Sequence, residues 1–412
     1  MRLPFERRPV KIAALFGRRN QPVDINTALR NTVKSCRWHV PVAILLVLVV
    51  LIGGATFAGL AADSLEGDEE VLFLPGLAYR NAQAGWVVTL RGYVFEPEFD
   101  SLRRRAVLAS LRKALGPDDD VDEEDSTSCD GVADDDADNP YFQRRARLFL
   151  VDHERGKRVR VYLKDRLMVL PESRSGGQLR GSFLLPGDVF RRELLAGRNP
   201  TIPFTVPMGH DRPAHRAPLH VVEPLGVSVI SDIDDTIKIS DVLNKRELIC
   251  RTFFREFEAV PGLAKIYAEH ARAGVSFHYV SGSPWQLYPE LSKFLKHTGF
   301  PDGSFHLREL RLKSIVDFAT ADPLAYKVDT ISDLLNRLPR REFVLIGDSG
   351  EKDPEVYAEI ARKYRRQVRA ILIRDVRAPG EIDERIATLR KGLPGLRFIV
   401  FRDASELRGV RF

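Results

Sequence analysis

The second half of the chain alternates short, mostly apolar, β-rich runs with longer segments of helical periodicity. The runs are Leu225–Ile230, Val275–Val280 and Phe343–Ile346. Their length and composition are typical of strands buried on both faces of a parallel sheet. Before the third run, apolar residues recur at the spacing of one helix face, at Ile331, Leu334, Leu335 and Leu338. The pattern therefore predicts an α/β domain with a parallel sheet over residues 225–412.

Residues 63–224 show a different pattern, in which short β-rich runs are separated by turns. The runs are Trp86–Phe95, Ala146–Val151, Arg158–Leu163, Ser182–Leu185 and Thr201–Val206. Polar pieces or pieces that contain glycine or proline lie between several of them, as expected for consecutive short strands. We therefore expect an antiparallel sandwich or barrel in this region, interrupted by one helix at about Ser101–Leu115.

Residues 117–139 within that region are dominated by acidic side chains. They include twelve aspartates and glutamates, no lysine or arginine, and almost no large apolar residue, a composition typical of a disordered loop. Because the whole chain has a formal net charge of +6, the remainder is more strongly basic. Its basic runs could face anionic lipid or form a solvated surface. No nucleic-acid-binding motif is present, and nothing in the sequence identifies a protein partner.

The N-terminal part of the chain has the pattern of a single membrane anchor. Residues 40–62 are uncharged and mostly apolar, and a helix of this length spans a bilayer core. The preceding arm, residues 1–39, is strongly basic, whereas acidic residues follow from Asp63 onward. By the positive-inside rule, the arm stays in the cytoplasm and the catalytic domain is extracytoplasmic. A cleaved signal peptide is the alternative, because Gly59-Leu60-Ala61 is a small-x-small site.

The strongest indication of chemistry is the sequence SDIDDTIKIS, residues 231–240, directly behind the first apolar run. It places Asp232 and Asp234 at the carboxyl end of a predicted strand, the edge at which open α/β sheets bind ligands. Two acids there can catalyse phosphoryl transfer together, one as the nucleophile and the other as proton donor and acceptor. A divalent cation would neutralise the charge of the carboxylates and of the substrate oxygens. Alone, the pattern also fits the metal site of sugar transferases or a solvated turn.

Three further motifs follow in order. Ser281 ends the second run in VSGSP, where its hydroxyl could hold a phosphate oxygen, although an ordinary turn has the same composition. Lys327 falls near the first turn of the predicted helix, within reach of a phosphate, or is a surface lysine. Asp348 and Asp353 lie in GDSGEKDPE behind the third run and offer the oxygen ligands that Mg²⁺ prefers. Asp353 could instead cap the helix that follows it.

In this order, the four motifs resemble those of the haloacid dehalogenase superfamily of phosphotransferases. The sequence around these motifs is similar to that of one branch of the superfamily, the catalytic domain of the actin-patch-associated type of phosphatidate phosphatase. The segments that carry this likeness are SDIDDTIK, HYVSGSPWQLYPEL, FHLREL, and LIGDSGEKDPEVY followed by AILIRDV. The resemblance covers about residues 225–405 and implies a Rossmann-like fold without a cap domain.

The resemblance also implies a role for each of these residues. Asp232 would be the nucleophile, and Asp234 the general acid and base. Ser281 and Lys327 would hold the phosphoryl group. The cofactor would be Mg²⁺, bound at Asp232, Asp234, Asp348 and Asp353.

The predicted catalytic domain leaves no room for a large lid. About 45 residues separate the first motif from the second apolar run, and a similar number separate the second motif from the third. Connecting helices use most of that length. An open site tolerates a phosphate on a bulky molecule or at a membrane surface. Trp285, Leu287 and Tyr288, just behind the second motif, form either an apolar rim over lipid or the buried face of the next helix.

Together, these features predict a membrane-anchored, Mg²⁺-dependent phosphatase that acts through an aspartyl-phosphate. The preferred reaction is hydrolysis of phosphatidate to diacylglycerol. One alternative is a phosphatase of proteins or of soluble phosphomonoesters. The other is a non-catalytic module that binds membrane lipid, although the intact Asp232 and Asp234 count against it.

Overall fold

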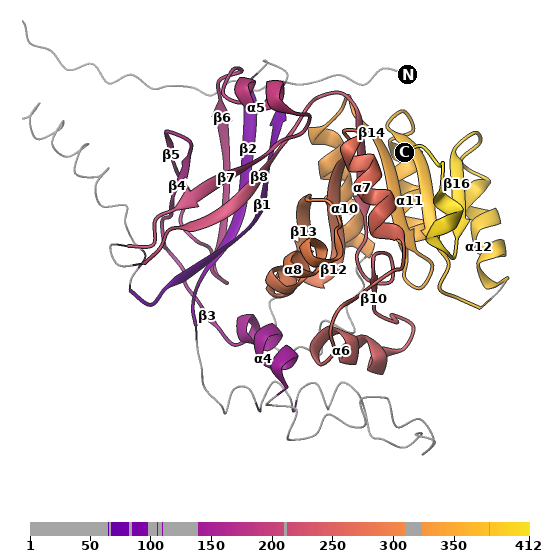
Figure 1. Ribbon diagram of the computed structural model, residues 1–412, viewed down its shortest axis with the longest axis horizontal. Helices are drawn as coiled ribbons and strands as arrows, with labels where there is room; N and C mark the ends of the chain where they lie inside the picture. The colour runs from indigo at the N-terminus through magenta and orange to yellow at the C-terminus, as the bar shows by residue number, and fades with distance from the viewer. Residues whose placement is uncertain are drawn as a thin grey trace, which may run out of the picture. The chain divides into compact units, whose positions relative to one another are not determined.

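Most of the chain after the predicted membrane segment belongs to one compact unit, which starts at Ala62. The computed structural model describes residues 65, 67–81, 85–97, 105, 109, 139–209, 212–309, 324–378 and 380–412. Figure 1 shows two large sheets, one drawn in purple to magenta and the other in orange to yellow. They correspond to the β-rich region and to the α/β region.

The β-rich region forms one eight-stranded sheet. Its strands are β1 (Glu70–Arg80), β2 (Trp86–Glu96), β3 (Asp152–His153), β4 (Arg160–Leu163), β5 (Arg166–Val169), β6 (Gln178–Leu185), β7 (Thr201–Val206) and β8 (His215–Val222). The order is β3-β2-β1-β8-β7-β4-β5, with β6 paired to β2. The pairs are antiparallel except for β1 with β8. The predicted β-rich character is confirmed, and the predicted antiparallel pairing holds except for the parallel pair of β1 and β8.

One predicted strand of this region is a helix instead. The predicted strand Ala146–Val151 begins with the last residue of helix α4 (Pro140–Ala146) and continues as a 3₁₀ turn (Arg147–Phe149). The side chain of Asn139 accepts two backbone N–H groups at the start of α4, and Pro140 occupies the first helical position. Both are helix-start signals that outweigh the β-rich composition behind them. Of the predicted helix at about 101–115 only positions 105 and 109 are described, and the acidic residues up to 138 lie outside the described part.

The α/β region is built on a six-stranded sheet. Its strands are β9 (Val227–Ser231), β12 (Ser276–Pro284), β13 (Ser304–Arg308), β14 (Glu342–Asp348), β15 (Val368–Arg374) and β16 (Arg397–Phe401). The order is β13-β12-β9-β14-β15-β16, and every pair is parallel. The strand order thus reverses between β9 and β14, and such a switch point is where open α/β sheets bind ligands. The predicted parallel sheet is confirmed.

Helices connect these strands, and a small insertion lies beside the switch point. The helices are α6 (Lys245–Phe253), α7 (Leu263–Arg272), α8 (Tyr288–Thr298), α10 (Leu324–Arg337), α11 (Asp353–Lys363) and α12 (Glu381–Arg390). Between β9 and β12, where every residue is described, the chain adds α6 and a two-stranded sheet of β10 (Lys238–Ile239) and β11 (Glu258–Ala259). This connection contains no larger cap, as predicted.

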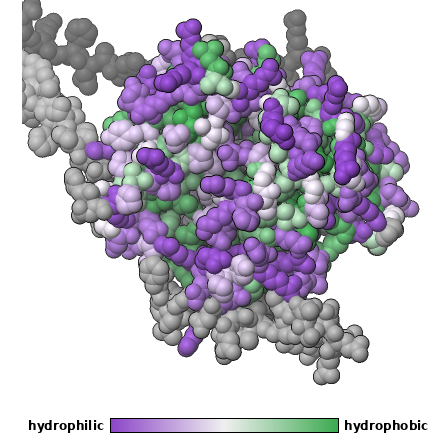
Figure 2. Space-filling view, in the orientation of Figure 1, coloured by the Kyte–Doolittle hydropathy of each residue, from purple (hydrophilic) through white to green (hydrophobic). Residues whose placement is uncertain are grey.

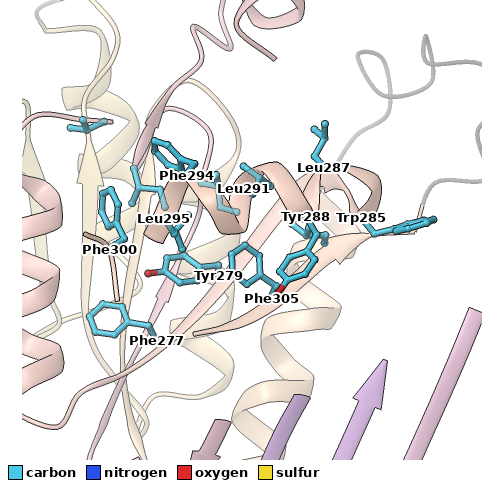
Figure 3. Packing of buried hydrophobic residues seen from close by; sticks show 14 of the residues in the cluster. Phe277, Tyr279, Trp285, Leu287, Tyr288, Leu291, Phe294, Leu295, Phe300 and Phe305 are labelled. Atoms are coloured by element: carbon cyan, nitrogen blue, oxygen red, sulfur yellow. The ribbon is translucent and has the colours of Figure 1, made fainter. Parts of the chain in front are cut away.

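The two regions share a hydrophobic core. Trp285 stacks on Tyr93 of β2 with ring centroids 3.6 Å apart, and one cluster joins Tyr93 to buried residues of the α/β region. Trp285, Leu287 and Tyr288 are at most 7% exposed, and Figure 3 shows Tyr288 beside Phe305 in this cluster. The interpretation of these three side chains as a rim over lipid is therefore wrong. They form the buried face of the segment that enters α8.

The predicted membrane segment, residues 40–62, lies outside the described residues. Within the part of the chain that the structure describes, no helix has both the length and the apolar composition needed to cross a bilayer. The face seen in Figure 2 is covered mainly by hydrophilic side chains, with apolar residues in small groups between them. The anchor therefore stays a prediction from the sequence.

Candidate active site

The first predicted motif forms the loop that leaves the carboxyl end of β9. The backbone N–H of Asp232 donates to the carbonyl of Ile346 in β14 at 2.9 Å, which fixes Asp232 at the sheet edge. The chain turns sharply at Asp235, whose φ of 50° lies in the left-handed region that aspartate tolerates better than most residues. The Asp235 carboxylate holds this turn by accepting the backbone N–H groups of residues 240–242 at 2.6 to 3.0 Å. Asp235 therefore has a structural role beside Asp232 and Asp234.

Asp234 connects the first predicted motif to the second. Its Oδ1 accepts a hydrogen bond from the Ser240 hydroxyl at 2.7 Å and lies 2.8 Å from Nζ of Lys238. Its Oδ2 accepts from the hydroxyls of Ser283 at 2.6 Å and Ser281 at 3.3 Å. Burial alone would raise the pKa of Asp234, but the Lys238 ammonium and the hydrogen bonds from Lys238, Ser283 and Ser240 outweigh burial and lower this pKa to about 2. Asp234 is thus an ionised, fully hydrogen-bonded carboxylate.

Lys327 connects the first motif to the fourth. It lies in the first turns of α10, as predicted, but it is buried, so the alternative of a surface lysine is wrong. Its Nζ is 2.9 Å from Oδ1 of Asp232, 2.6 Å from Oδ1 of Asp353 and 2.9 Å from Oε2 of Glu351. Burial would lower the pKa of Lys327, but Asp232, Asp353 and Glu351 outweigh it and hold this pKa well above its ordinary value. Lys327 is therefore a charged group amid three carboxylates.

Asp348 is the last residue of β14 and stands beside Asp232 at the switch point. Its Oδ1 accepts the backbone N–H groups of Gly350 at 2.6 Å and Glu351 at 3.0 Å. Its Oδ2 is buried and has no hydrogen-bond partner among the described residues. Burial, followed by the neighbouring acids Asp353 and Glu351, raises the pKa of Asp348 well above its ordinary value. The site therefore holds an unsatisfied carboxylate oxygen that burial keeps from water.

Asp353 is the first residue of α11, but its side chain does not cap the helix. The N-cap residue is Lys352, and no side-chain cap bond is formed. Oδ1 of Asp353 accepts from Lys327, and its Oδ2 accepts the backbone N–H of Asp348 at 3.4 Å. A Cβ atom at Gly347 would lie 2.2 Å from Oδ2 of Asp353, so glycine leaves the space that this carboxylate occupies. The capping interpretation is wrong, because the carboxylate belongs to the site.

Three carboxylates of this cluster fit a divalent cation. Asp232, Asp348 and Asp353 are buried, and one oxygen of each lies within 4.8 Å of the others. Oδ1 of Asp232, like Oδ2 of Asp348, makes no hydrogen bond within the described residues, although the Lys327 ammonium lies beside it as an ion-pair partner. Several acids thus face one lysine, and hard oxygen donors of this kind suit Mg²⁺. Asp234, the fourth predicted ligand, contacts Lys238 and the serines instead of joining this group.

The site also contains residues to which the sequence analysis gave no role. They are Lys238, Ser240, Ser283 and Glu351. All four lie inside the quoted motif segments, so their presence was visible. Their partners come from other elements, and that pairing could not be deduced from spacing along the chain. The sequence did contain one signal: Lys238 stands between two isoleucines in the first motif. A lysine in such an apolar stretch indicates a buried charge that needs a partner.

Comparisons with known proteins show which proteins this part of the chain resembles. Residues 227–375 match the family described as "Phosphatidate phosphatase APP1, catalytic domain". The phosphatidate phosphatase APP1 of Saccharomyces cerevisiae is 33% identical over 171 residues, which are 40% of this chain and 29% of that protein. An uncharacterised protein of Schizosaccharomyces pombe is 33% identical over 169 residues, which are 40% of this chain and 27% of that protein.

The similarity is confined to part of each protein. This chain covers less than a third of the length of these two curated relatives, and the family match runs from the start of β9 to just beyond β15. The match includes the six predicted site residues, Asp232, Asp234, Ser281, Lys327, Asp348 and Asp353. Residues 227–375 are therefore similar to the catalytic domain of a phosphatidate phosphatase, a hydrolase, which confirms the family resemblance that the four motifs indicated.

Proposed function

We propose that this protein is a Mg²⁺-dependent phosphatase of phosphate monoesters, with phosphatidate as its preferred substrate and diacylglycerol as the product. One observation carries the proposal: the Lys327 ammonium contacts both Asp232 and Asp353 at the switch point. A nucleophile, a phosphate-binding cation and a hard oxygen donor thus lie within one buried cluster. The family match of residues 227–375 supports the same class of reaction.

The first half of the reaction transfers the phosphoryl group to the protein. A carboxylate oxygen of Asp232 forms a bond to phosphorus while the bond from phosphorus to the substrate oxygen breaks. Asp234 gives a proton to the departing alkoxide, which leaves as the alcohol. Asp234 must carry this proton when the step begins, although Lys238 and the hydrogen bonds from Lys238, Ser283 and Ser240 lower its pKa to about 2.

The second half releases phosphate. Asp234, now ionised, takes a proton from a water molecule, and the water oxygen attacks phosphorus. The bond between phosphorus and Asp232 breaks, and the free carboxylate returns. Ser281 and Lys327 hold the phosphoryl oxygens in both halves. Mg²⁺ bound by Asp232, Asp348 and Asp353 would neutralise negative charge on the phosphoryl group and on these carboxylates.

The proposal predicts that the full chain releases phosphate from phosphatidate in mixed micelles. A chelator should abolish this release, and added Mg²⁺ should restore it, because Lys327 alone contacts three of the clustered carboxylates and cannot neutralise all of them. Faster release from a soluble phosphomonoester than from phosphatidate would favour the alternative substrate class. Vesicle binding without phosphate release from either substrate would support a lipid-binding module and overturn the proposal.

We also propose that residues 40–62 anchor the protein, with the catalytic region extracytoplasmic. The apolar length and the change from basic to acidic flanks support this arrangement. The protein should stay in the membrane fraction through high salt and alkaline wash. Protease added outside intact cells or spheroplasts should remove the part after Asp63 and leave the basic arm. Protection of that part would reverse the topology, and a soluble product that begins near Asp63 would show a cleaved signal peptide.

A further inference from the structure

Lys238 is a buried lysine beside the reactive pair, and the proposed reaction assigns it no role. Its side chain is 2% exposed, and its Nζ lies 2.8 Å from Oδ1 of Asp234. The same ammonium donates to the hydroxyl of Ser240, which in turn donates to Oδ1 of Asp234. A buried ammonium is costly unless it is paired and hydrogen-bonded. The pairing with Asp234 is therefore a fixed part of the site, unlike an exposed ion pair.

The two oxygens of Asp234 have different partners. Oδ1 pairs with the ammonium of Lys238 in strand β10 and accepts a hydrogen bond from Ser240, the residue after this strand. Oδ2 accepts hydrogen bonds from the hydroxyls of Ser281 and Ser283 in the second motif. Since Ser281 is the residue proposed to hold the phosphoryl group, Oδ2 is the oxygen on the substrate side. Oδ1 is turned toward the β10 insertion and is occupied there.

Several contacts prevent Lys238 from turning away. Its backbone pairs with Ala259 of β11 and forms a bridge with Asp234. Its Nζ lies 5.0 Å from the ring centroid of Phe257, a distance at which a cation and an aromatic ring attract each other. The guanidinium of Arg145 covers the same ring at 3.7 Å. Phe257 thus lies in contact with both cations.

Arg145 is itself held by the α/β region. It belongs to α4, which contacts α6 (Figure 1). Its Nη1 donates to the carbonyls of Thr252 at 3.0 Å and Arg255 at 2.6 Å, at the end of α6. The β-rich region therefore supports Lys238 through Phe257.

We propose that Lys238 is a positioning residue that occupies Oδ1 of Asp234, so that Oδ2 is the oxygen that exchanges a proton with the leaving group and with water. The inference rests on the proposed phosphatase function. It concerns Asp234, because within the described residues Lys238 pairs with this carboxylate and not with the cluster of Asp232, Asp348 and Asp353. Without Lys238, the carboxylate of Asp234 can rotate, and the proton is no longer delivered from a fixed oxygen.

This role predicts a dependence on the leaving group. An alkoxide leaves slowly unless it is protonated, whereas a 4-nitrophenolate leaves readily without a proton. Lys238→Met should therefore reduce kcat/KM by about 100-fold or more for dioctanoyl phosphatidate, since general acid catalysis contributes about 10²- to 10⁴-fold. The same variant should lose less than about 10-fold for 4-nitrophenyl phosphate, since kcat/KM reports only the first half of the reaction. Asp234→Asn should show the same selective loss, and Lys238→Arg should recover part of it.

The control is Lys293→Met, because this lysine is exposed and, within the described residues, pairs with Glu290 of its own helix. It should leave both substrates unaffected. Equal losses for the two substrates in Lys238→Met, or no loss, would overturn the positioning role. If a thermal melt shows that Lys238→Met is unfolded, Ser240→Ala provides the test instead, because it removes the other partner of Oδ1. This variant should lose kcat/KM for phosphatidate more than for 4-nitrophenyl phosphate, by a smaller factor than Lys238→Met. A wild-type chain that hydrolyses neither substrate would overturn the proposed function and this inference with it.

Discussion

Replacement of Asp232 by asparagine is expected to reduce turnover by several orders of magnitude. The amide can neither attack phosphorus nor serve as an anionic ligand, and removal of a covalent nucleophile costs up to about 10⁶-fold in kcat in other hydrolases. The fold should survive, because burial and neighbouring acids raise the pKa of Asp232 well above its ordinary value. A neutral side chain relieves that unfavourable charge. Phosphate release and a thermal melt of the same preparation measure the two effects.

The matched control for this variant is Asp333→Asn. Asp333 lies on α10, its side chain is 54% exposed, and it pairs with Arg337 one turn away. Surface pairs of this kind contribute at most about 1 kcal/mol, so activity and melting should stay close to wild type. Near-normal turnover in Asp232→Asn would show that another group attacks phosphorus.

Replacement of Lys327 by methionine is expected to damage both stability and activity. Its ammonium is buried and contacts Asp232, Asp353 and Glu351. Removal of one partner from a buried ion pair typically costs about 3 to 5 kcal/mol, because the remaining charges stay buried without compensation. Urea unfolding in the presence of a chelator should show a loss of this size in the free energy of unfolding. Turnover should fall as well, since the cation proposed to hold the phosphoryl group is then missing.

Added Mg²⁺ provides the second readout for Lys327→Met. A cation in the acidic cluster compensates the same charges, so Mg²⁺ should raise the stability of the variant more than that of the wild type. Lys391→Met, at an exposed position after α12, should change neither stability nor its dependence on Mg²⁺. If Lys327→Met unfolds at the wild-type urea concentration, the ammonium does not balance these carboxylates.

The elements that hold the candidate site were predictable from the sequence because most of the predicted site residues lie directly behind the predicted strands along the chain. The apolar runs before Asp232 and Asp348 are strands β9 and β14, and their parallel pairing brings the two carboxylates to one edge. Lys327 was placed correctly near a helix start by the periodicity behind it. Each of these predictions needed only local pattern and the rule that parallel strands end together.

Other features depend on contacts between distant segments. Trp285 could have been a surface residue or a core residue until its partner Tyr93, from the other sheet, was known. Lys238 likewise needed Phe257 and the fold of β10 to show where its ammonium lies. The helical residues 146–149 were missed for a different reason. The start signals at Asn139 and Pro140 stand in the sequence, but the β-rich composition that follows was given more weight.

The stacking of Trp285 on Tyr93 bears on how far the catalytic region is an independent module. A fragment that starts at Leu225 would remove Tyr93 and expose Trp285 to water, together with the part of the cluster that covers it. A fragment that stops at residue 375, where the family match ends, would also lose β16 from the edge of the sheet. The boundaries of sequence similarity are thus not boundaries of folding. We therefore expect that transfer of the proposed activity to another protein requires the β-rich sheet as well as the α/β region.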